Sequence, residues 1–171
     1  DQYAASGGIL AGLKGDFVDL EGYFATVLSK EPSINNMMLV GHNTVRSLVL
    51  GDAKRAPTAA ELAIMRDHIR LALEQGCCGF SSGLIYRPGR YSDTEEVVEL
   101  AKVAGEFDAL YTTHMRNEGD KLLEAVDEAL LIGKESRSHL HISHHKAAGK
   151  ANWGKVSQSL MKVEEALVNG Q

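Results

Sequence analysis

Apolar residues recur every three to four positions in five stretches of the chain, which is the spacing of amphipathic α-helices. The best defined stretch begins with Thr58 and Glu61, which form a capping-box pattern, and stops at Gly76. Ser92 and Glu95 repeat the capping-box pattern before the next stretch. The pattern therefore predicts helices over residues 17–28, 58–76, 92–104, 122–133 and 156–167.

Short apolar or mixed runs of strand length lie between these helices, at residues 37–42, 77–84, 109–114 and 139–144. Alternating strands and helices predict parallel strands with right-handed crossovers, in a doubly wound sheet or a barrel. The last three predicted strands end at Leu84, His114 and His144, and this spacing of 30 residues suits a (β/α)8 barrel. Because a complete barrel takes roughly 250 residues, the predicted fold is α/β, a partial TIM (β/α)8 barrel of parallel strands alternating with helices.

The remaining segments complete the predicted organisation. Residues 1–15 are expected to form a disordered arm, and residues 16–171 the partial barrel domain. The polar linker over residues 43–57 is expected to be a functional loop. The chain begins with Asp rather than Met, as expected of a piece cut from a longer protein or of a processed product.

Composition and charge narrow the classes of partner. A hydrophobic content of 44% is in the globular range, and the net charge of -5 comes with Lys and Arg scattered among acidic residues. No basic stripe indicates nucleic acid or an anionic membrane. No apolar run approaches the roughly 18 residues of a spanning helix, and the N-terminus lacks the pattern of a signal peptide. We therefore expect a cytoplasmic protein that binds a small molecule.

The cysteines Cys77 and Cys78 are adjacent, which excludes a disulfide framework. They stand in the apolar stretch GCCGFSSGL. This context favours buried small hydrophobes over metal or redox thiols.

Two histidines carry the clearest chemical signal. His114 and His144 each close a predicted strand, and the carboxyl ends of parallel strands are where ligands and catalytic groups gather. If the two strands are neighbours, about 4.8 Å apart, both imidazoles can converge on one metal ion or on a pair of ions. Equivalent positions on successive strands favour metal ligation over a structural role.

Other histidines surround this pair in the stretch HLHISHH. Strand alternation would place Leu140, Ile142 and His144 on one face, with the remaining histidines of the stretch on the other. His144 is preferred because it ends the strand in line with apolar neighbours, and the alternative is a surface histidine patch without function. His42 also ends a strand and is as consistent with a hydrogen bond that anchors a loop as with a site.

Polar residues near the two histidines suit an anionic amide substrate. Lys146 follows His144 by two positions, Arg116 follows His114 by two, and Tyr86 comes just after the second strand. Lysine and arginine pair with carboxylates, and a tyrosine hydroxyl donates to an oxyanion or a carboxylate. Glu118 is expected to cap or pair at the start of the fourth helix rather than to act as a base.

Four motifs together resemble the D-aminoacylases and related N-acyl-D-amino-acid deacylases of the amidohydrolase superfamily. They are LVGHNTVR, GFSSGLIYRPGRYSDTEEVVELA, YTTHMRNEGDKLLEAVDEAL and HISHHKAAGKANWGK. The resemblance covers roughly residues 16–168, and the ordered set of four is specific where a single short motif is not.

The resemblance implies a TIM-barrel hydrolase in which zinc activates water to attack the amide of an N-acyl-D-amino acid. It makes His114 and His144 the metal ligands from the fifth and sixth strands of the family's barrel. Lys146 matches a position that holds the substrate carboxylate, and Tyr86 and Arg116 lie in matching motifs.

Several family features have no counterpart here. They are the HxH pair of the first strand, the metal-binding cysteine of the second and the catalytic aspartate of the eighth. Cys77 and Cys78 align with a different motif and do not replace that cysteine. The general base is therefore expected outside this chain, so that the isolated chain binds zinc weakly and has negligible turnover.

Two alternatives remain open. One is a cyclic amidase of the dihydroorotase or hydantoinase type, which uses a carboxylated lysine, although no lysine lies in a predicted strand. The other is a noncatalytic α/β module whose histidines pack or bind metal incidentally. The exposed sheet edge of a partial barrel also favours self-association, so a homo-oligomer such as a dimer is consistent with the sequence without having to be physiological.

Overall fold

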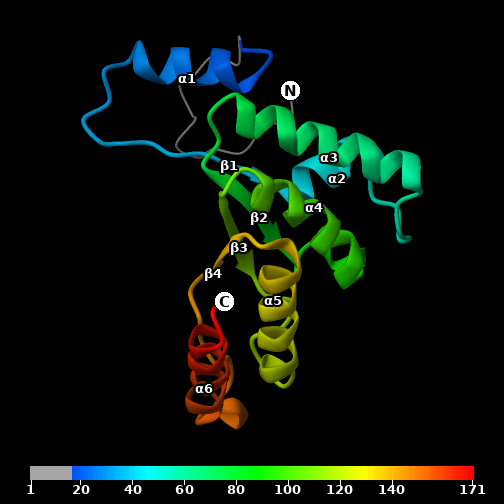
Figure 1. The fold of residues 1–171 in the computed structure, drawn as a ribbon, viewed down its shortest axis with the longest axis vertical. Coiled ribbons are helices and arrows are strands. Elements are labelled where there is room, and N and C mark those ends of the chain that lie inside the picture. Colours follow the sequence, from blue (N-terminus) through cyan, green and yellow to red (C-terminus); the bar gives the residue numbers. More distant parts are fainter. Residues whose placement is uncertain (1–16) are drawn as a thin grey trace. The chain divides into compact units, whose positions relative to one another are not determined.

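The computed structural model describes residues 17–171, which divide into two compact units between Met37 and Met38 (Figure 1). In the first unit, α1 (Leu20–Leu28) begins where the Asp19 carboxylate accepts a hydrogen bond from the backbone N–H of Gly22 at 2.8 Å. The predicted arm over residues 1–15 lies outside the described residues, and the predicted domain over residues 16–171 stays a prediction.

The second unit is built on a four-stranded parallel sheet (Figure 1). Its strands lie in chain order: β1 (Leu39–Gly41), β2 (Gly79–Gly83), β3 (Leu110–His114) and β4 (His139–Ile142). A doubly wound sheet would reverse its strand order at a switch point, whereas a barrel does not. The predicted α/β fold with parallel strands is confirmed, and the sequential order is that of a barrel segment.

Helices follow each of the four strands, and the apolar periodicity predicts all but the first of them. Their bounds are α2 (His42–Leu50), α3 (Ala59–Glu74), α4 (Thr94–Glu106), α5 (Leu122–Ser136) and α6 (Lys155–Val168), with 3₁₀ turns at Gly89–Tyr91 and Lys150–Asn152. None of the helices in residues 17–171 has both the length and the apolar character that crossing a membrane requires.

The cap of α3 forms as predicted, and that of α4 does not. Thr58 and Glu61 make a reciprocal capping box, with the Thr58 N–H donating to Glu61 at 2.7 Å. At α4 the N-cap is Asp93, whose carboxylate accepts from the Glu96 N–H at 2.8 Å. The Ser92 hydroxyl instead donates to the Gly89 carbonyl. The predicted capping box at Ser92 and Glu95 is therefore wrong, and the N-cap lies one residue later.

The polar linker predicted over residues 43–57 is also wrong in its first half, where α2 forms. The buried side of α2 consists of His42, Val45 and Arg46, at helical spacing. Two of these three residues are polar, so the buried side of α2 lacks the row of apolar residues by which an amphipathic helix is recognised in a sequence. Gly51, with a positive φ of 62°, ends the helix.

The helix-covered face of the sheet carries the larger side chains. Phe80 and Tyr111 stack there, and the Tyr111 hydroxyl hydrogen-bonds Ser82 at 2.8 Å. Leu140 and Ile142 pack against the apolar face of α5. Leu140 and Ile142 therefore share one face of β4, as the predicted alternation requires. That face packs against α5, and His144 lies beyond the end of the strand.

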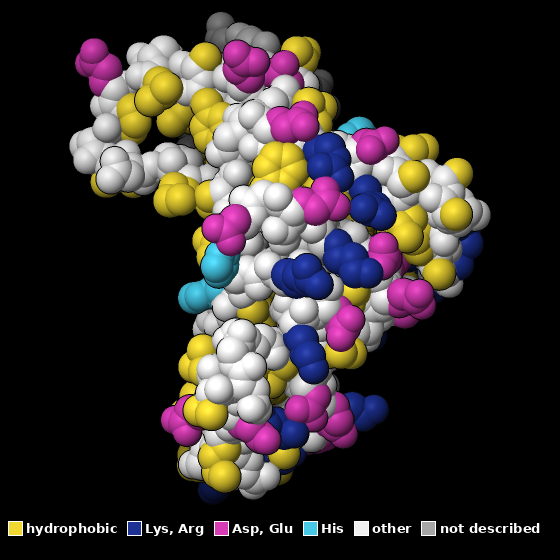
Figure 2. All heavy atoms as spheres, viewed as in Figure 1, with side chains coloured by type: hydrophobic (Ala, Val, Ile, Leu, Met, Phe, Trp, Pro, Cys, Tyr) yellow, Lys and Arg dark blue, Asp and Glu magenta, His cyan; other side chains and the backbone are white. Residues whose placement is uncertain are grey.

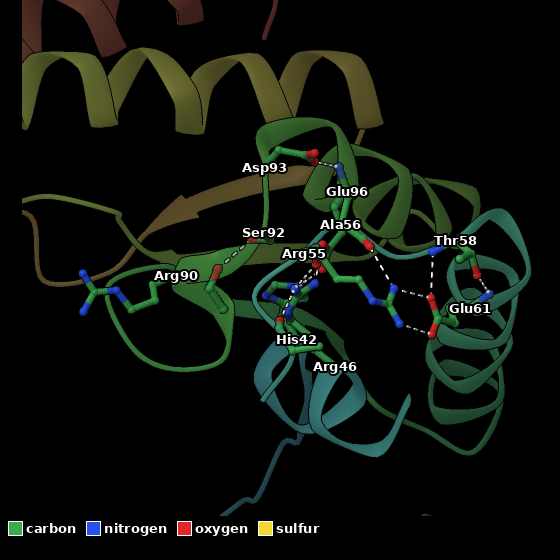
Figure 3. A network of polar contacts seen from close by, with 12 residues as sticks. His42, Arg46, Arg55, Ala56, Thr58, Glu61, Arg90, Ser92, Asp93 and Glu96 are labelled. Carbon is green, nitrogen blue, oxygen red and sulfur yellow. Dashed lines mark hydrogen bonds and ion pairs between the residues drawn. The ribbon is translucent and has the colours of Figure 1, made fainter. Parts of the chain in front are cut away.

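A buried ionic network joins α2 to α4 (Figure 3). The Glu96 carboxylate accepts from Arg46 at 2.5 Å and pairs with His42 Nε2 at 2.8 Å, and all three residues are buried. Arg46 also donates to the carbonyls of Ala53 and Arg55, at 3.2 and 2.7 Å. His42 is therefore a packed anchoring residue, one of the two roles that the sequence allowed.

Elsewhere, charged side chains of opposite sign are interspersed. On the face shown in Figure 2, basic and acidic residues alternate across the surface. Arg70 of α3, for example, pairs with Glu106 of α4 at 2.6 Å. Ion pairs at such exposure contribute little stability, and they leave no single-signed patch on this face.

The two cysteines are free thiols. Cys77 is buried, and burial raises the pKa of its thiol to about 11. The Cys78 thiol donates to the Met38 carbonyl at 3.2 Å. The packing role predicted for Cys77 agrees with these surroundings.

Glu61 provides a test of local electrostatics. Two hydrogen bonds from Arg55, at 2.7 Å each, and one from the Thr58 N–H lower its pKa from an ordinary 4.5 to about 2. A depressed carboxyl pKa stabilises the folded state above pH 4.5, and that contribution is lost as the pH falls toward 2. We expect Arg55→Ala to move the pKa of Glu61 back toward 4.5 in an NMR titration of its carboxyl group. An unshifted Glu61 in Arg55→Ala would contradict the assignment.

Candidate metal centre

Two histidines from neighbouring strands meet at the carboxyl edge of the sheet. His114 is the last residue of β3, and His144 lies two residues beyond the end of β4. Their rings meet in a T-shaped arrangement, with His114 Nδ1 2.8 Å from His144 Nε2. The structure thus brings together the two residues that the sequence predicted as metal ligands.

The approach of His144 depends on a backbone feature that alternation does not describe. The Ser143 N–H donates to the Thr113 carbonyl at 3.0 Å, which keeps the chain in register with β3 up to that residue. His144 then takes a left-handed conformation, with φ of 41°. Non-glycine residues adopt this conformation rarely, and often at functional sites. The turn, and not the face of the strand, directs the ring toward His114.

A third group, Glu118, joins the pair from the loop after β3. His114, Glu118 and His144 each offer one ligand atom, and these atoms lie within 4.8 Å of one another. Glu118 is 2.9 Å from His144 Nδ1 and accepts from Lys146 Nζ at 2.6 Å. From the sequence, Glu118 was expected to cap or pair at the start of the predicted helix over residues 122–133. That helix is α5, which begins at Leu122, and the Glu118 carboxylate lies at the site instead. Its only sequence signal was its position four residues after a predicted ligand.

The pKa values at this edge follow from burial and mutual charge. Burial lowers the pKa of His114, and the neighbouring His144 and Lys146 lower it further against the opposing effect of Glu118. Burial alone would raise the pKa of Glu118, but the hydrogen bond from Lys146 and the nearby histidines bring it below its ordinary value. The site therefore favours a neutral His114 beside a charged Glu118, the protonation states that cation binding requires.

The other predicted site residues divide into two groups. The ring of Tyr86 lies 4.9 Å from the ring of His114, between centroids, and Lys146 contacts Glu118. Arg116 instead donates from its guanidinium to both carboxylate oxygens of Glu128 on α5, at 2.9 Å each. The structure thus places Tyr86 and Lys146 beside the histidines, whereas Arg116 forms an ion pair with a residue of α5.

The fold and the site together define a segment of a parallel (β/α)8 barrel whose histidines converge at the carboxyl ends of adjacent strands. Barrel enzymes place their active sites at this end of the strands. No family model matches the chain.

Individual proteins do match it. N-acyl-D-glutamate deacylase of Alcaligenes xylosoxydans xylosoxydans is 40% identical over 154 residues, which are 90% of this chain and 32% of the relative. D-aminoacylase of the same organism is 35% identical over 85% of this chain and 30% of its own length. The chain therefore spans about a third of the length of these curated relatives.

Solved structures agree with these relatives. The crystal structure of N-acyl-D-glutamate deacylase from Bordetella bronchiseptica, in complex with zinc and a phosphonate inhibitor that mimics the tetrahedral intermediate, superposes with a TM-score of 0.87. It is 40% identical, over 94% of this chain and 34% of that one. A D-aminoacylase, described as defining a novel subset of amidohydrolases, gives a TM-score of 0.84 at 34% identity, over 89% of this chain and 32% of that one. The chain is thus homologous to the D-aminoacylases and N-acyl-D-amino-acid deacylases, as its motifs predicted.

Proposed function

We propose that this chain is the metal-ligand segment of a zinc-dependent N-acyl-D-amino-acid deacylase. The observation that carries the proposal is the 2.8 Å approach of His114 Nδ1 and His144 Nε2 at the carboxyl ends of β3 and β4. The names of the homologous proteins support the substrate class, a small N-acylated amino acid. The cytoplasmic location expected from the sequence stays a prediction.

The donor set fits zinc. Zinc–nitrogen bonds of about 2.0–2.1 Å require two donors on one ion to lie within about 4 Å of each other. The two imidazole nitrogens meet that requirement, and the lowered pKa of His114 keeps its ring neutral. When bound, zinc lowers the pKa of a water ligand to about 7 and polarises a carbonyl oxygen.

The side chains around the histidines suit an anionic substrate. Lys146, half-exposed although it pairs with Glu118, keeps ammonium N–H groups for a substrate carboxylate, and the half-exposed Tyr86 places a phenol beside His114. We also propose Arg116 as a substrate-binding residue, and its guanidinium is held in place by Glu128. We assign the general base to no residue of this chain, so the proposed turnover belongs to a protein that also carries that base.

The cyclic-amidase alternative finds less support. Such enzymes bridge their metals with a carboxylated lysine on a strand. None of the four strands described in residues 17–171 contains a lysine.

Zinc titration by calorimetry tests the proposal. We expect His114→Ala and His144→Ala each to weaken zinc binding by at least about 100-fold, because loss of a ligand should exceed the 10–100-fold cost of losing an outer-shell partner. His68→Ala, which removes an exposed histidine on α3, is the matched control and should bind zinc as the unmodified chain does. Equal zinc affinity in all four proteins would refute the ligand assignment.

A further inference from the structure

We propose that Glu118 is a positioning residue that holds His144 in the tautomer protonated on Nδ1, so that the Nε2 lone pair faces His114. The inference rests on the proposed function, since it concerns which nitrogen of His144 is offered to the metal. Metal-binding histidines donate their second N–H to a carboxylate or a carbonyl group, which fixes the tautomer and the ring orientation.

The geometry gives His144 two competing neighbours on its Nδ1 side. A Glu118 carboxylate oxygen is 2.9 Å from His144 Nδ1, and Lys146 Nζ is 3.1 Å from the same nitrogen. The carboxylate only accepts, so it favours a proton on Nδ1, whereas the ammonium only donates, so it favours a lone pair there. The two neighbours thus favour opposite tautomers.

Glu118 resolves this competition because it also accepts from Lys146. The hydrogen bond from Lys146 Nζ to Glu118, at 2.6 Å, is shorter than its 3.1 Å contact with His144. Charge-assisted bonds of this kind are the stronger ones. With Glu118 present, Lys146 is engaged by the carboxylate. Without it, Lys146 would donate to Nδ1 and move the proton to Nε2, the nitrogen that faces His114.

Glu118 is itself held firmly enough to act on its neighbours. Its side chain is 9% exposed, against 47% for His144 and 50% for Lys146. The Glu118 carbonyl accepts from the Ala148 N–H at 2.6 Å. Asn117 Oδ1 accepts from the N–H groups of Gly119 and Lys121, at 2.8 and 3.1 Å, which closes the turn around it. Glu118, the least exposed of the three side chains, thus stands on a backbone held by hydrogen bonds at its own carbonyl and at the next residue.

Nitrogen-15 NMR of the histidine side chains in the metal-free chain tests the proposal directly. At pH 8, above the ordinary histidine pKa of about 6.5, long-range proton–nitrogen spectra distinguish the two neutral tautomers. We expect His144 to carry its proton on Nδ1 in the unmodified chain and on Nε2 in Glu118→Ala. Glu124→Ala, which removes an exposed acid from α5, is the control and should leave the tautomer unchanged.

Zinc affinity provides the second measurement. Glu118→Ala should weaken zinc binding by about 10–100-fold, as loss of an outer-shell partner does, and Glu118→Asp should recover part of that loss. A merely structural role would lower stability without changing the tautomer.

The outcomes separate this inference from the proposed function. His144 protonated on Nε2 in the unmodified chain would overturn the positioning role, and this spectrum needs no variant to fold. Zinc binding that requires both histidines, together with an unchanged tautomer in Glu118→Ala, would overturn the positioning role and leave the proposed function standing. The predicted tautomers without zinc binding would support the positioning geometry and refute the proposed function.

Discussion

Replacing Glu96 with alanine is expected to lower the free energy of unfolding by about 3–5 kcal/mol, the usual cost of removing one partner from a buried ion pair. Among residues 17–171, the substitution would leave the buried Arg46 guanidinium with the carbonyls of Ala53 and Arg55 as its remaining acceptors. His42 would lose the partner of its Nε2, while its Nδ1 already has no hydrogen-bond partner among the described residues. Domains of this size have total stabilities of roughly 5–15 kcal/mol, so the change should be plain in urea unfolding followed by circular dichroism.

Glu99 offers a matched control on the same helix. Its carboxylate pairs with Lys102 and Arg66 at partial exposure, and exposed pairs contribute about 0–1 kcal/mol. Glu99→Ala should therefore leave the unfolding midpoint nearly unchanged. Similar losses from Glu96→Ala and Glu99→Ala would show that burial of the network does not determine its energy.

Gly105→Ala is expected to destabilise the packing of α4 against α5 by about 2 kcal/mol. A Cβ atom on Gly105 would lie 1.9 Å from the backbone carbonyl oxygen of Ser136, in the last turn of α5. A backbone group cannot rotate away as a side chain can, so the helices must separate, and overpacking of this kind costs about 1–3 kcal/mol or more. The better helix propensity of alanine, worth up to about 1 kcal/mol, offsets only part of that cost.

Thermal and urea unfolding of Gly105→Ala would measure this loss. Gly119→Ala is the control, because the nearest atom to its added Cβ would lie 3.5 Å away, at an ordinary contact distance. A Gly105→Ala protein as stable as the original would mean that the two helices separate at no cost.

The sequence by itself determined the features that depend on near neighbours. Apolar spacing located four strands and five of the helices, because residues at i+2 or at i+3 and i+4 share one face of an element. The capping box of Thr58 and Glu61 was recognised for the same reason, since its two residues are three positions apart. The 30-residue period also placed His114 and His144 at equivalent strand ends, where parallel pairing brings them together.

Only the tertiary structure decided the contacts between residues that are distant in the chain. Glu96 and His42 are 54 residues apart, and Glu118 and Lys146 are 28 apart. No local pattern marks such pairs, because their approach depends on strand register and on how each crossover helix packs. The helix α2 was missed for this reason, since its buried residues His42 and Arg46 are polar and become helix-core residues only when Glu96 meets them. The left-handed turn at His144 is likewise marked by no local pattern, and it is this turn, just after Ser143 pairs with β3, that directs the ring to His114.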